Sequence, residues 1–85
     1  MRRAIYPGTF DPVTVGHLDI MKRASKMFDE IIVAVADSTA KKPMFTLEQR
    51  VAMVEAGTTE ISNLKVIGFN KLLVDLSDEL DANII

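Results

Sequence analysis

The feature that most constrains the fold is an uninterrupted apolar stretch at residues 31–36, IIVAVA. A strand with one face in solvent alternates apolar and polar residues, whereas a strand covered on both faces is apolar at every position. The stretch is also far shorter than the roughly 20 apolar residues that a membrane-spanning helix requires. Residues 31–36 therefore predict a central strand of a parallel sheet.

Strand and helix patterns alternate around this stretch. A first strand is expected at residues 4–6, ending where Pro7 and Gly8 favour a turn. A helix should begin at His17, because apolar residues then recur at spacings of three and four along one face, which we expect to be buried. The residues of that face are Leu18, Met21, Ala24 and Phe28, widened by Ile20 and Met27.

The second half of the chain continues the alternation. Thr46 and Gln49 have the spacing of a capping box, which predicts a helix start, and Gly57 predicts the end of that helix. A third strand is expected at residues 64–68 and the beginning of a fourth at residues 83–85. The helix between them is marked by Leu72, Leu73, Leu76 and Leu80.

Four strands that alternate with helices in this way are typical of a doubly wound, Rossmann-like α/β fold with a parallel sheet. Parallel neighbours need crossover connections, which are nearly always right-handed. The length of 85 residues allows one domain and no more. Ligands in such sheets bind at the carboxyl ends of the strands, so we look for chemistry in the loop after the first strand.

That loop, residues 8–17, has a glycine near each end and hydroxyl side chains between them. Glycine permits close approach of a ligand, and a helix N-terminus offers free N–H groups to a phosphate. The loop lacks the spacing of the two commoner phosphate-binding motifs. His17, the sole histidine, could donate to a transferring phosphoryl group, or it could be a helix-start residue bonded to backbone.

Two lysines follow the central strand and would share the carboxyl edge with the first loop. Lys41 or Lys42 could bind a substrate phosphate from the side, although composition alone favours a solvated charged turn before Pro43.

Composition excludes several classes of protein. A net charge of -2 gives no broad basic field, so neither nucleic acid nor an anionic membrane is an expected partner. The absence of cysteine excludes thiolate ligation, and the single histidine and the carboxylate spacing do not suggest a metal site. Arg2 and Arg3 resemble the start of a signal peptide, but the next apolar stretch breaks at Pro7. We therefore expect a soluble cytoplasmic protein.

Two segments carry a resemblance to a known family. The strings YPGTFDP at residues 6–12 and GH at 16–17, followed by KKPMFTLEQR at 41–50, resemble the bacterial type of phosphopantetheine adenylyltransferase. The string TVGH at residues 14–17 alone would indicate only the wider nucleotidyltransferase superfamily, with its (His or Thr)-x-Gly-His signature. The string at residues 41–50 narrows the resemblance.

A third segment extends the resemblance along the chain. Residues 66–69, VIGF, followed by Leu72 and Leu73, are similar to the family's third strand and to the loop that lines its pantetheine pocket.

The resemblance implies adenylyl transfer from ATP to 4'-phosphopantetheine, giving dephospho-CoA and pyrophosphate in coenzyme A synthesis. The substrate phosphate would attack the α-phosphorus directly, without a covalent enzyme intermediate, so positioning and charge stabilisation would do most of the catalysis. Mg²⁺ would accompany ATP, bound mainly through phosphate oxygens and water. A homohexamer is implied for the intact enzyme.

The resemblance also implies site residues. His17 would contact ATP and stabilise the transition state, Thr9 would contact both substrates, and the backbone near Phe10 would lie against the nucleotide. Lys41 would hold the pantetheine phosphate and so take part in catalysis, and Leu73 would contribute to the pantetheine site.

The chain departs from the family pattern in two respects. Val15 stands where the family usually has Asn, which should alter affinity rather than abolish chemistry. Family members are longer, with arginines and a Ser- and Thr-rich helix start that would follow Ile85. Residues 1–85 are therefore interpreted as the N-terminal, nucleotide-binding part of one domain, incomplete relative to the family and inactive alone. An open sheet edge should also favour self-association.

Three alternatives stay open. Another adenylyl- or cytidylyltransferase of the superfamily would share Gly8, Gly16 and His17. A non-catalytic nucleotide-binding or assembly module would bind ATP without releasing pyrophosphate. In the plainest alternative, the loop glycines are only turn residues of an α/β domain.

Overall fold

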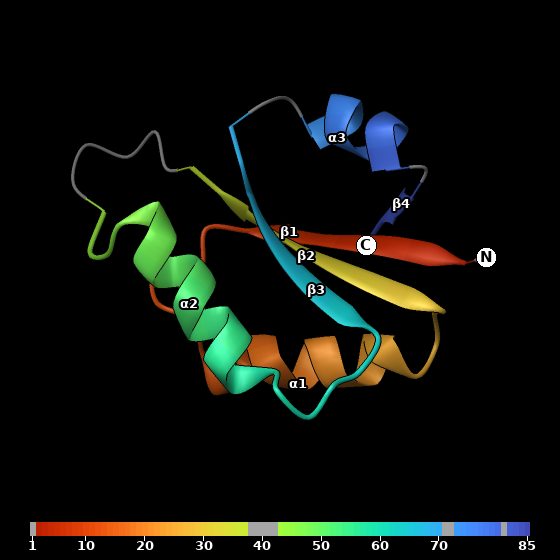
Figure 1. Ribbon diagram of the computed structural model, residues 1–85, viewed down its shortest axis with the longest axis horizontal. Coiled ribbons are helices and arrows are strands. Elements are labelled where there is room, and N and C mark those ends of the chain that lie inside the picture. Colours follow the sequence, from red (N-terminus) through yellow and green to blue (C-terminus); the bar gives the residue numbers. More distant parts are fainter. Residues whose placement is uncertain (1, 38–42, 71–72, 81) are drawn as a thin grey trace.

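The structure is a computed structural model that describes residues 2–37, 43–70, 73–80 and 82–85, with the backbone alone at residues 73 and 74 (Figure 1). Strands and helices alternate along the chain. Their bounds are β1 (Arg3–Gly8), α1 (Val15–Ser25), β2 (Glu30–Ala36), α2 (Leu47–Gly57), β3 (Leu64–Phe69), α3 (Leu73–Leu80) and β4 (Asn83–Ile84).

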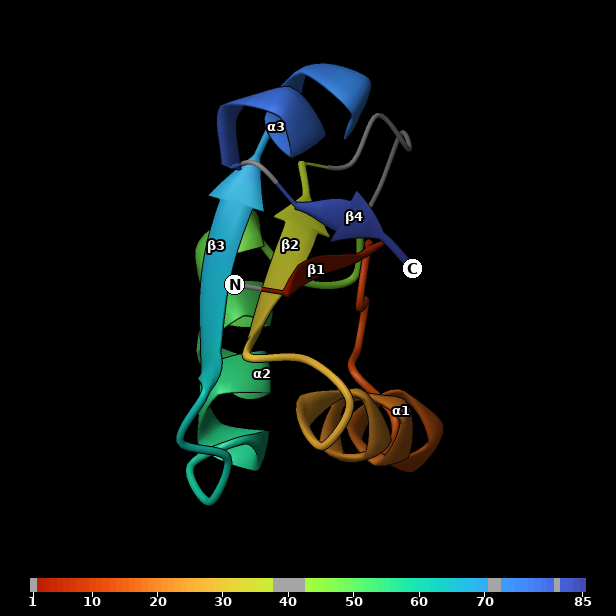
Figure 2. The same cartoon turned by 90° about the vertical axis from the view of Figure 1, so that its right-hand side faces the viewer.

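All strand pairings in the described chain are parallel, and the sheet order is β3-β2-β1-β4. Helices α1 and α2 cover one face of the sheet and α3 lies on the other, as the two views in Figures 1 and 2 show. This arrangement confirms the predicted doubly wound, Rossmann-like α/β fold.

β2 is the central strand that its composition predicted. The side chains of Ile31, Val33 and Val35 are buried in a cluster with Met21 of α1 and Val54 of α2. On the other face, Ile32 and Ala34 are buried with Ile5 and with Leu76 of α3. Because successive side chains of a strand point to opposite faces, the unbroken apolar run supplies both cores.

The prediction that β1 ends before Pro7 is wrong, since the strand continues through Pro7 and Gly8. The backbone polar groups of Ile5 face β4, and the carbonyl of Ile5 accepts a hydrogen bond from the N–H of Ile85 at 2.9 Å. Pro7 lies two residues further along β1, so its backbone also faces the β4 side of the strand. In the described structure, however, β4 pairs with β1 only at Ala4 and Ile5. The missing N–H of Pro7 therefore interrupts no bond with β4.

α1 buries Met21 and Ala24 and partly buries Leu18 and Phe28, as expected. The expected burial of Ile20 and Met27 is wrong, because they are 48% and 62% exposed. Successive helical residues are about 100° apart, so Ile20 lies beside buried Met21 in sequence but turns away from the sheet, whereas Met27 lies in the turn that follows α1.

α2 begins and ends as predicted. Thr46 Oγ1 accepts from the N–H of Gln49 at 3.1 Å, and Gln49 Oε1 accepts from the N–H of Thr46 at 2.9 Å. At the other end, a Cβ added to Gly57 would lie 2.9 Å from Leu18 Cδ2, so glycine allows α2 to end in close contact with α1.

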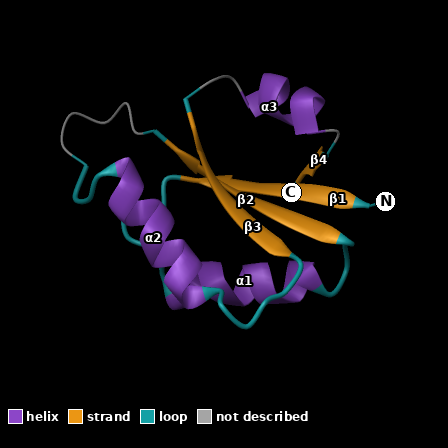
Figure 3. Ribbon diagram, in the orientation of Figure 1, coloured by secondary structure: helices purple, strands orange, loops and turns teal. Residues whose placement is uncertain are grey.

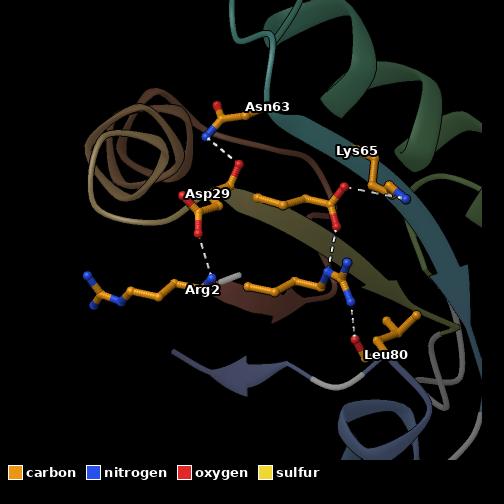
Figure 4. A network of polar contacts seen from close by, with 7 residues as sticks. Arg2, Asp29, Asn63, Lys65 and Leu80 are labelled. Carbon is orange, nitrogen blue, oxygen red and sulfur yellow. Dashed lines mark hydrogen bonds and ion pairs between the residues drawn. The ribbon is translucent and has the colours of Figure 1, made fainter.

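Ion pairs and hydrogen bonds join the amino ends of the strands (Figure 4). Glu30 accepts from Arg3 Nε at 2.7 Å and pairs with Lys65 Nζ at 3.6 Å, which links β1, β2 and β3. Arg3 also donates to the carbonyl of Leu80 at 2.9 Å, at the last turn of α3. These contacts fix the end of the sheet that lies away from the β1–α1 loop.

Asn63 adds a second set of contacts at this end. Its Nδ2 lies within 2.8 to 3.3 Å of the backbone carbonyls of Ser25, Phe28 and Asp29. Asp29 in turn accepts from the backbone N–H of Arg2, and Figure 4 shows these side chains together.

None of the helices in the described chain combines the length and the apolar composition needed to cross a membrane.

Candidate functional site

The strand order places the loop after β1 at the usual ligand position of this fold. Chain order runs from β1 outward through β2 to β3 and then returns to β4 on the other side of β1. Doubly wound sheets bind ligands outside the carboxyl ends of the strands at this reversal. In Figure 3 the β1–α1 connection, drawn in teal, lies at the same edge as the start of α2.

Thr14 and His17 form a reciprocal capping box at the start of α1. The hydroxyl of Thr14 accepts from the N–H of His17 at 3.2 Å, and the N–H of Thr14 donates to His17 Nδ1 at 2.9 Å. An Nδ1 that accepts this bond carries no proton, so a neutral ring carries its proton on Nε2. No described residue bonds to Nε2, which is therefore available to a ligand.

The ring of Phe10 packs against the ring of His17. It is 2% exposed and lies edge-on to the His17 ring with centroids 4.9 Å apart, and edge-on to Tyr6 at 5.5 Å. Burial raises the pKa of Tyr6, so its phenol stays neutral at ordinary pH. Phe10 has a φ of 48°, a left-handed conformation that is costly for a bulky residue and recurs at functional sites.

Gly8 and Gly16 are glycines for different reasons. A Cβ on Gly8 would lie 2.9 Å from Phe10 Cζ, so Gly8 is required by the packing of that ring. A Cβ on Gly16 would meet only Thr14 Oγ1, at 3.6 Å, so no packing requires it. The space beside Gly16 is open at a helix N-terminus whose first turn has no acidic residue, which suits an anion.

Two residues at this edge escaped the sequence analysis. Arg50 of α2 is 1% exposed and bonds to the carbonyl of Thr9, and the carboxylate of Asp11 accepts from the N–H groups of Met44 and Phe45. A signal for Arg50 exists in the sequence, because it occupies the apolar stripe between Leu47 and Val54 at spacings of three and four. Asp11 has no comparable local signal.

The structure places three predicted site residues on the loop after β1 and in the first turn of α1. Thr9 is exposed, Phe10 is buried beneath the loop, and His17 is partly exposed at the start of α1. Lys41 lies outside the described residues. Leu73 is the first residue of α3, and its side chain is not among those described.

Among the described residues, no group of three or more His, Asp or Glu side chains could hold a metal ion. Asp11 is the acidic side chain of the loop, and both of its carboxylate oxygens already accept backbone N–H groups. A metal at this loop would therefore depend on ligands from a substrate and water.

A cavity of about 450 Å³ lies away from this loop, between α1 and the connection from α2 to β3. Its lining includes Leu18, Lys22 and Ile61 but none of Thr9, Phe10 and His17. This cavity is therefore separate from the predicted site.

Comparison with known proteins agrees with the architecture. Over 99% of its length the chain is similar to the lipopolysaccharide core biosynthesis protein of Thermoplasma volcanium GSS1, with a TM-score of 0.77, 29% identity and 72% of that chain covered. A candidate nicotinate-nucleotide adenylyltransferase of Vibrio parahaemolyticus has the same fold, with a TM-score of 0.74 and 22% identity. The chain aligns over 99% of its length but spans only 55% of that protein.

The sequence also matches a protein family over nearly its whole length. The family is described as cytidylyltransferase-like, and the match runs from residue 5 to residue 85. It includes β1 from Ile5 onward, the Thr14–His17 capping box and every later element of the sheet and its helices. The chain therefore belongs to the cytidylyltransferase-like family, within the nucleotidyltransferase superfamily.

Proposed function

We propose that this chain is the nucleotide-binding part of a phosphopantetheine adenylyltransferase. The enzyme would transfer an adenylyl group from ATP to 4'-phosphopantetheine. The observation that carries the proposal is the bond from the N–H of Thr14 to His17 Nδ1, which leaves Nε2–H as a donor beside the open N-terminus of α1.

In the proposed reaction, an oxygen of the substrate phosphate forms a bond to the α-phosphorus of ATP. The bond from that phosphorus to the bridging oxygen breaks, and pyrophosphate leaves. Charge grows on the oxygens of the transferring group, and the Nε2–H of His17 would donate to one of them. The edge-on contact with Phe10 would hold the imidazole in the orientation for that bond.

The remaining roles follow the family resemblance. Thr9, exposed beside the buried Phe10, would contact both substrates, and the backbone at Phe10 would lie against the nucleotide. Lys41 would pair with the pantetheine phosphate, and Leu73 would contribute to the pantetheine site.

Mg²⁺ belongs to the same proposal, as the ion that accompanies ATP and neutralises its phosphates. Because Asp11 is engaged with two backbone N–H groups, the ion would be held by phosphate oxygens and water. The cytoplasm as the site of the reaction and an assembly of several copies, hexameric in the family it resembles, complete the proposal.

The segment at residues 41–50 supports the specific substrate. The Thr14–His17 signature is shared by the superfamily, whereas Lys41 and the segment that follows it resemble the pantetheine enzyme in particular. Neither of the similar proteins is named for 4'-phosphopantetheine, so the acceptor must be tested directly.

The test is pyrophosphate release from ATP or CTP with either 4'-phosphopantetheine or nicotinate mononucleotide as acceptor. It is run on the 85-residue chain and on a version extended to the length of family members. Release that requires ATP and 4'-phosphopantetheine supports the proposal. Release with another pair identifies a different nucleotidyltransferase, and ATP binding without release in either version supports a non-catalytic module.

A further inference from the structure

Arg50 is a buried cation whose hydrogen-bond partners within the described part of the chain are all backbone carbonyls. Its Nη1 donates to the carbonyls of Thr9 and Ala36, each at 2.8 Å, and its Nε donates to that of Phe45 at 3.1 Å. These carbonyls belong to the loop after β1, the end of β2 and the residue before the N-cap of α2. One guanidinium thus joins three separate segments at the carboxyl edge of the sheet.

Asp11, in the loop after β1, accepts hydrogen bonds from backbone N–H groups that lie just before α2. Its Oδ2 accepts from the N–H of Met44 at 2.7 Å, and its Oδ1 accepts from the N–H of Phe45 at 2.9 Å. Phe45 is therefore held through its N–H by Asp11 and through its carbonyl by Arg50. The loop after β1 and the start of α2 cannot shift independently while both contacts exist.

The chemistry of Arg50 suggests more than a packing role. Its neighbours on the same stripe of α2, Leu47 and Val54, are apolar, and burying a charge among such residues costs energy. The planar fork of arginine can reach several carbonyls at once, whereas a lysine ammonium on a flexible chain cannot match that geometry. The hydrogen bond from Arg50 to the carbonyl of Thr9 connects this buried guanidinium to the candidate site.

We propose that Arg50 is a positioning residue for the nucleotide site, with Asp11 as its counterpart in the first loop. By holding the carbonyl of Thr9, Arg50 fixes the residue that precedes the left-handed Phe10, and through the Phe10 ring it fixes the orientation of His17. Neither Arg50 nor Asp11 needs to touch a substrate. The inference rests on the proposed function, because it concerns the same ATP site.

The test compares variants at this edge with a matched variant at the opposite edge. Asn63 is the control, because its amide also contacts the carbonyls of three residues, Ser25, Phe28 and Asp29, but at the amino ends of the strands (Figure 4). The variants are Arg50→Lys, Asp11→Asn and Asn63→Ala. Thermal unfolding by circular dichroism and the Kd for Mg-ATP by calorimetry are measured for each variant in the chain extended to the length of family members, at a temperature where all are folded.

All three variants should unfold at lower temperature, because each loses backbone contacts. Only Arg50→Lys and Asp11→Asn should bind Mg-ATP more weakly, by about 10-fold or more, since a displacement near 1 Å at a binding group can cost on the order of 10²-fold in rate. Asp11→Asn keeps the shape of the side chain and decides the question if Arg50→Lys does not fold.

Two other outcomes are distinct. If Asp11→Asn and Arg50→Lys bind Mg-ATP as well as Asn63→Ala does, Arg50 stabilises the fold only and the inference is overturned. If the unsubstituted chain extended to the length of family members does not bind Mg-ATP, the proposed function fails, and the inference fails with it.

Discussion

The backbone N–H of Thr14 donates to Nδ1 of His17 over 2.9 Å, and this one bond has two consequences. It completes the capping box of α1, which is a structural role for the sole histidine. It also leaves the proton of the neutral ring on Nε2, facing no described partner. The helix-start and ligand-binding interpretations of His17 are therefore compatible.

The two roles of His17 can be separated by His17→Gln. A glutamine three residues after the N-cap can complete a capping box, so the free energy of unfolding should change by less than about 0.5 kcal/mol. Adenylyl transfer by the extended chain should fall on the order of 10²- to 10³-fold, because the glutamine amide donates from a flexible side chain and not from a ring that Phe10 holds in place, so the donor is no longer preorganised. Urea unfolding and pyrophosphate release measure the two effects.

The matched variant is Thr14→Ala, which removes the capping hydroxyl and should cost about 1 kcal/mol of stability. Transfer activity within tenfold of the unsubstituted chain in His17→Gln would contradict the proposed role of Nε2.

Gly16→Ala should preserve the fold and weaken nucleotide binding. A methyl group there meets only Thr14 Oγ1 at 3.6 Å, and alanine favours a helix over glycine by up to about 1 kcal/mol. The same methyl would occupy the open space beside the N-terminus of α1, so the Kd for Mg-ATP should rise while the unfolding temperature stays equal or increases. Calorimetric titration and thermal unfolding give both values.

Gly8→Ala serves as the comparison. Its methyl would lie 2.9 Å from Phe10 Cζ, and that ring is enclosed by Tyr6 and His17 and cannot move aside. Stability should drop by about 1 to 3 kcal/mol, as is typical of an overpacked core. Unchanged ATP affinity in Gly16→Ala would mean that the phosphates bind elsewhere.

Glu30→Gln should destabilise the amino edge of the sheet. Glu30 pairs with both Arg3 and Lys65, and its side chain is only 25% exposed, so we expect a loss of roughly 1 kcal/mol in urea unfolding.

The control for this change is Asp19→Asn. Asp19 pairs with Arg23 on the surface of α1, with side chains 54% and 78% exposed, and such pairs contribute little. Equal losses in the two variants would show that the Glu30 contacts add nothing beyond a surface ion pair.

Lys41→Ala should raise the KM for 4'-phosphopantetheine in the extended chain by roughly 10-fold or more, because a charge-assisted phosphate contact is lost. The KM for ATP should change little. Lys42→Ala is the neighbouring control, and a larger effect from Lys42→Ala would transfer the role to that residue. Initial rates at varied acceptor concentration provide the comparison.

The parts of the fold that sequence predicted best are those set by local patterns. The apolar run of β2 and the capping box of α2 each depend on residues a few positions apart, and both were placed correctly. Pro7 and Gly8 were excluded from β1 because local turn preference ignores pairing, yet both pair with β2, opposite Ala34 and Val35. Sheet pairing between distant segments overrode the local signal.

In the candidate site, too, features set by local sequence differ from those set by contacts between distant segments. Glycine spacing and the rule that ligands bind at the carboxyl ends of strands single out the loop after β1, whereas the roles of Thr9 and Phe10 rest on the family resemblance and stay predictions. The contacts of Arg50 with Thr9 and of Asp11 with Met44 span 41 and 33 residues, and no local pattern reports a contact of that range. Their importance emerges only when the sheet brings the two loops to one edge.

The most direct test of the account is a nitrogen-15 NMR spectrum of the imidazole ring during titration with Mg-ATP. His17 is the only histidine, so its ring signals need no further assignment. The account predicts that the neutral form of the ring carries its proton on Nε2 before ATP is added, and that the Nε2 resonance changes and saturates as ATP binds. A ring protonated on Nδ1, or an Nε2 resonance that ATP leaves unchanged, would contradict the central claim that His17 donates to the nucleotide phosphates.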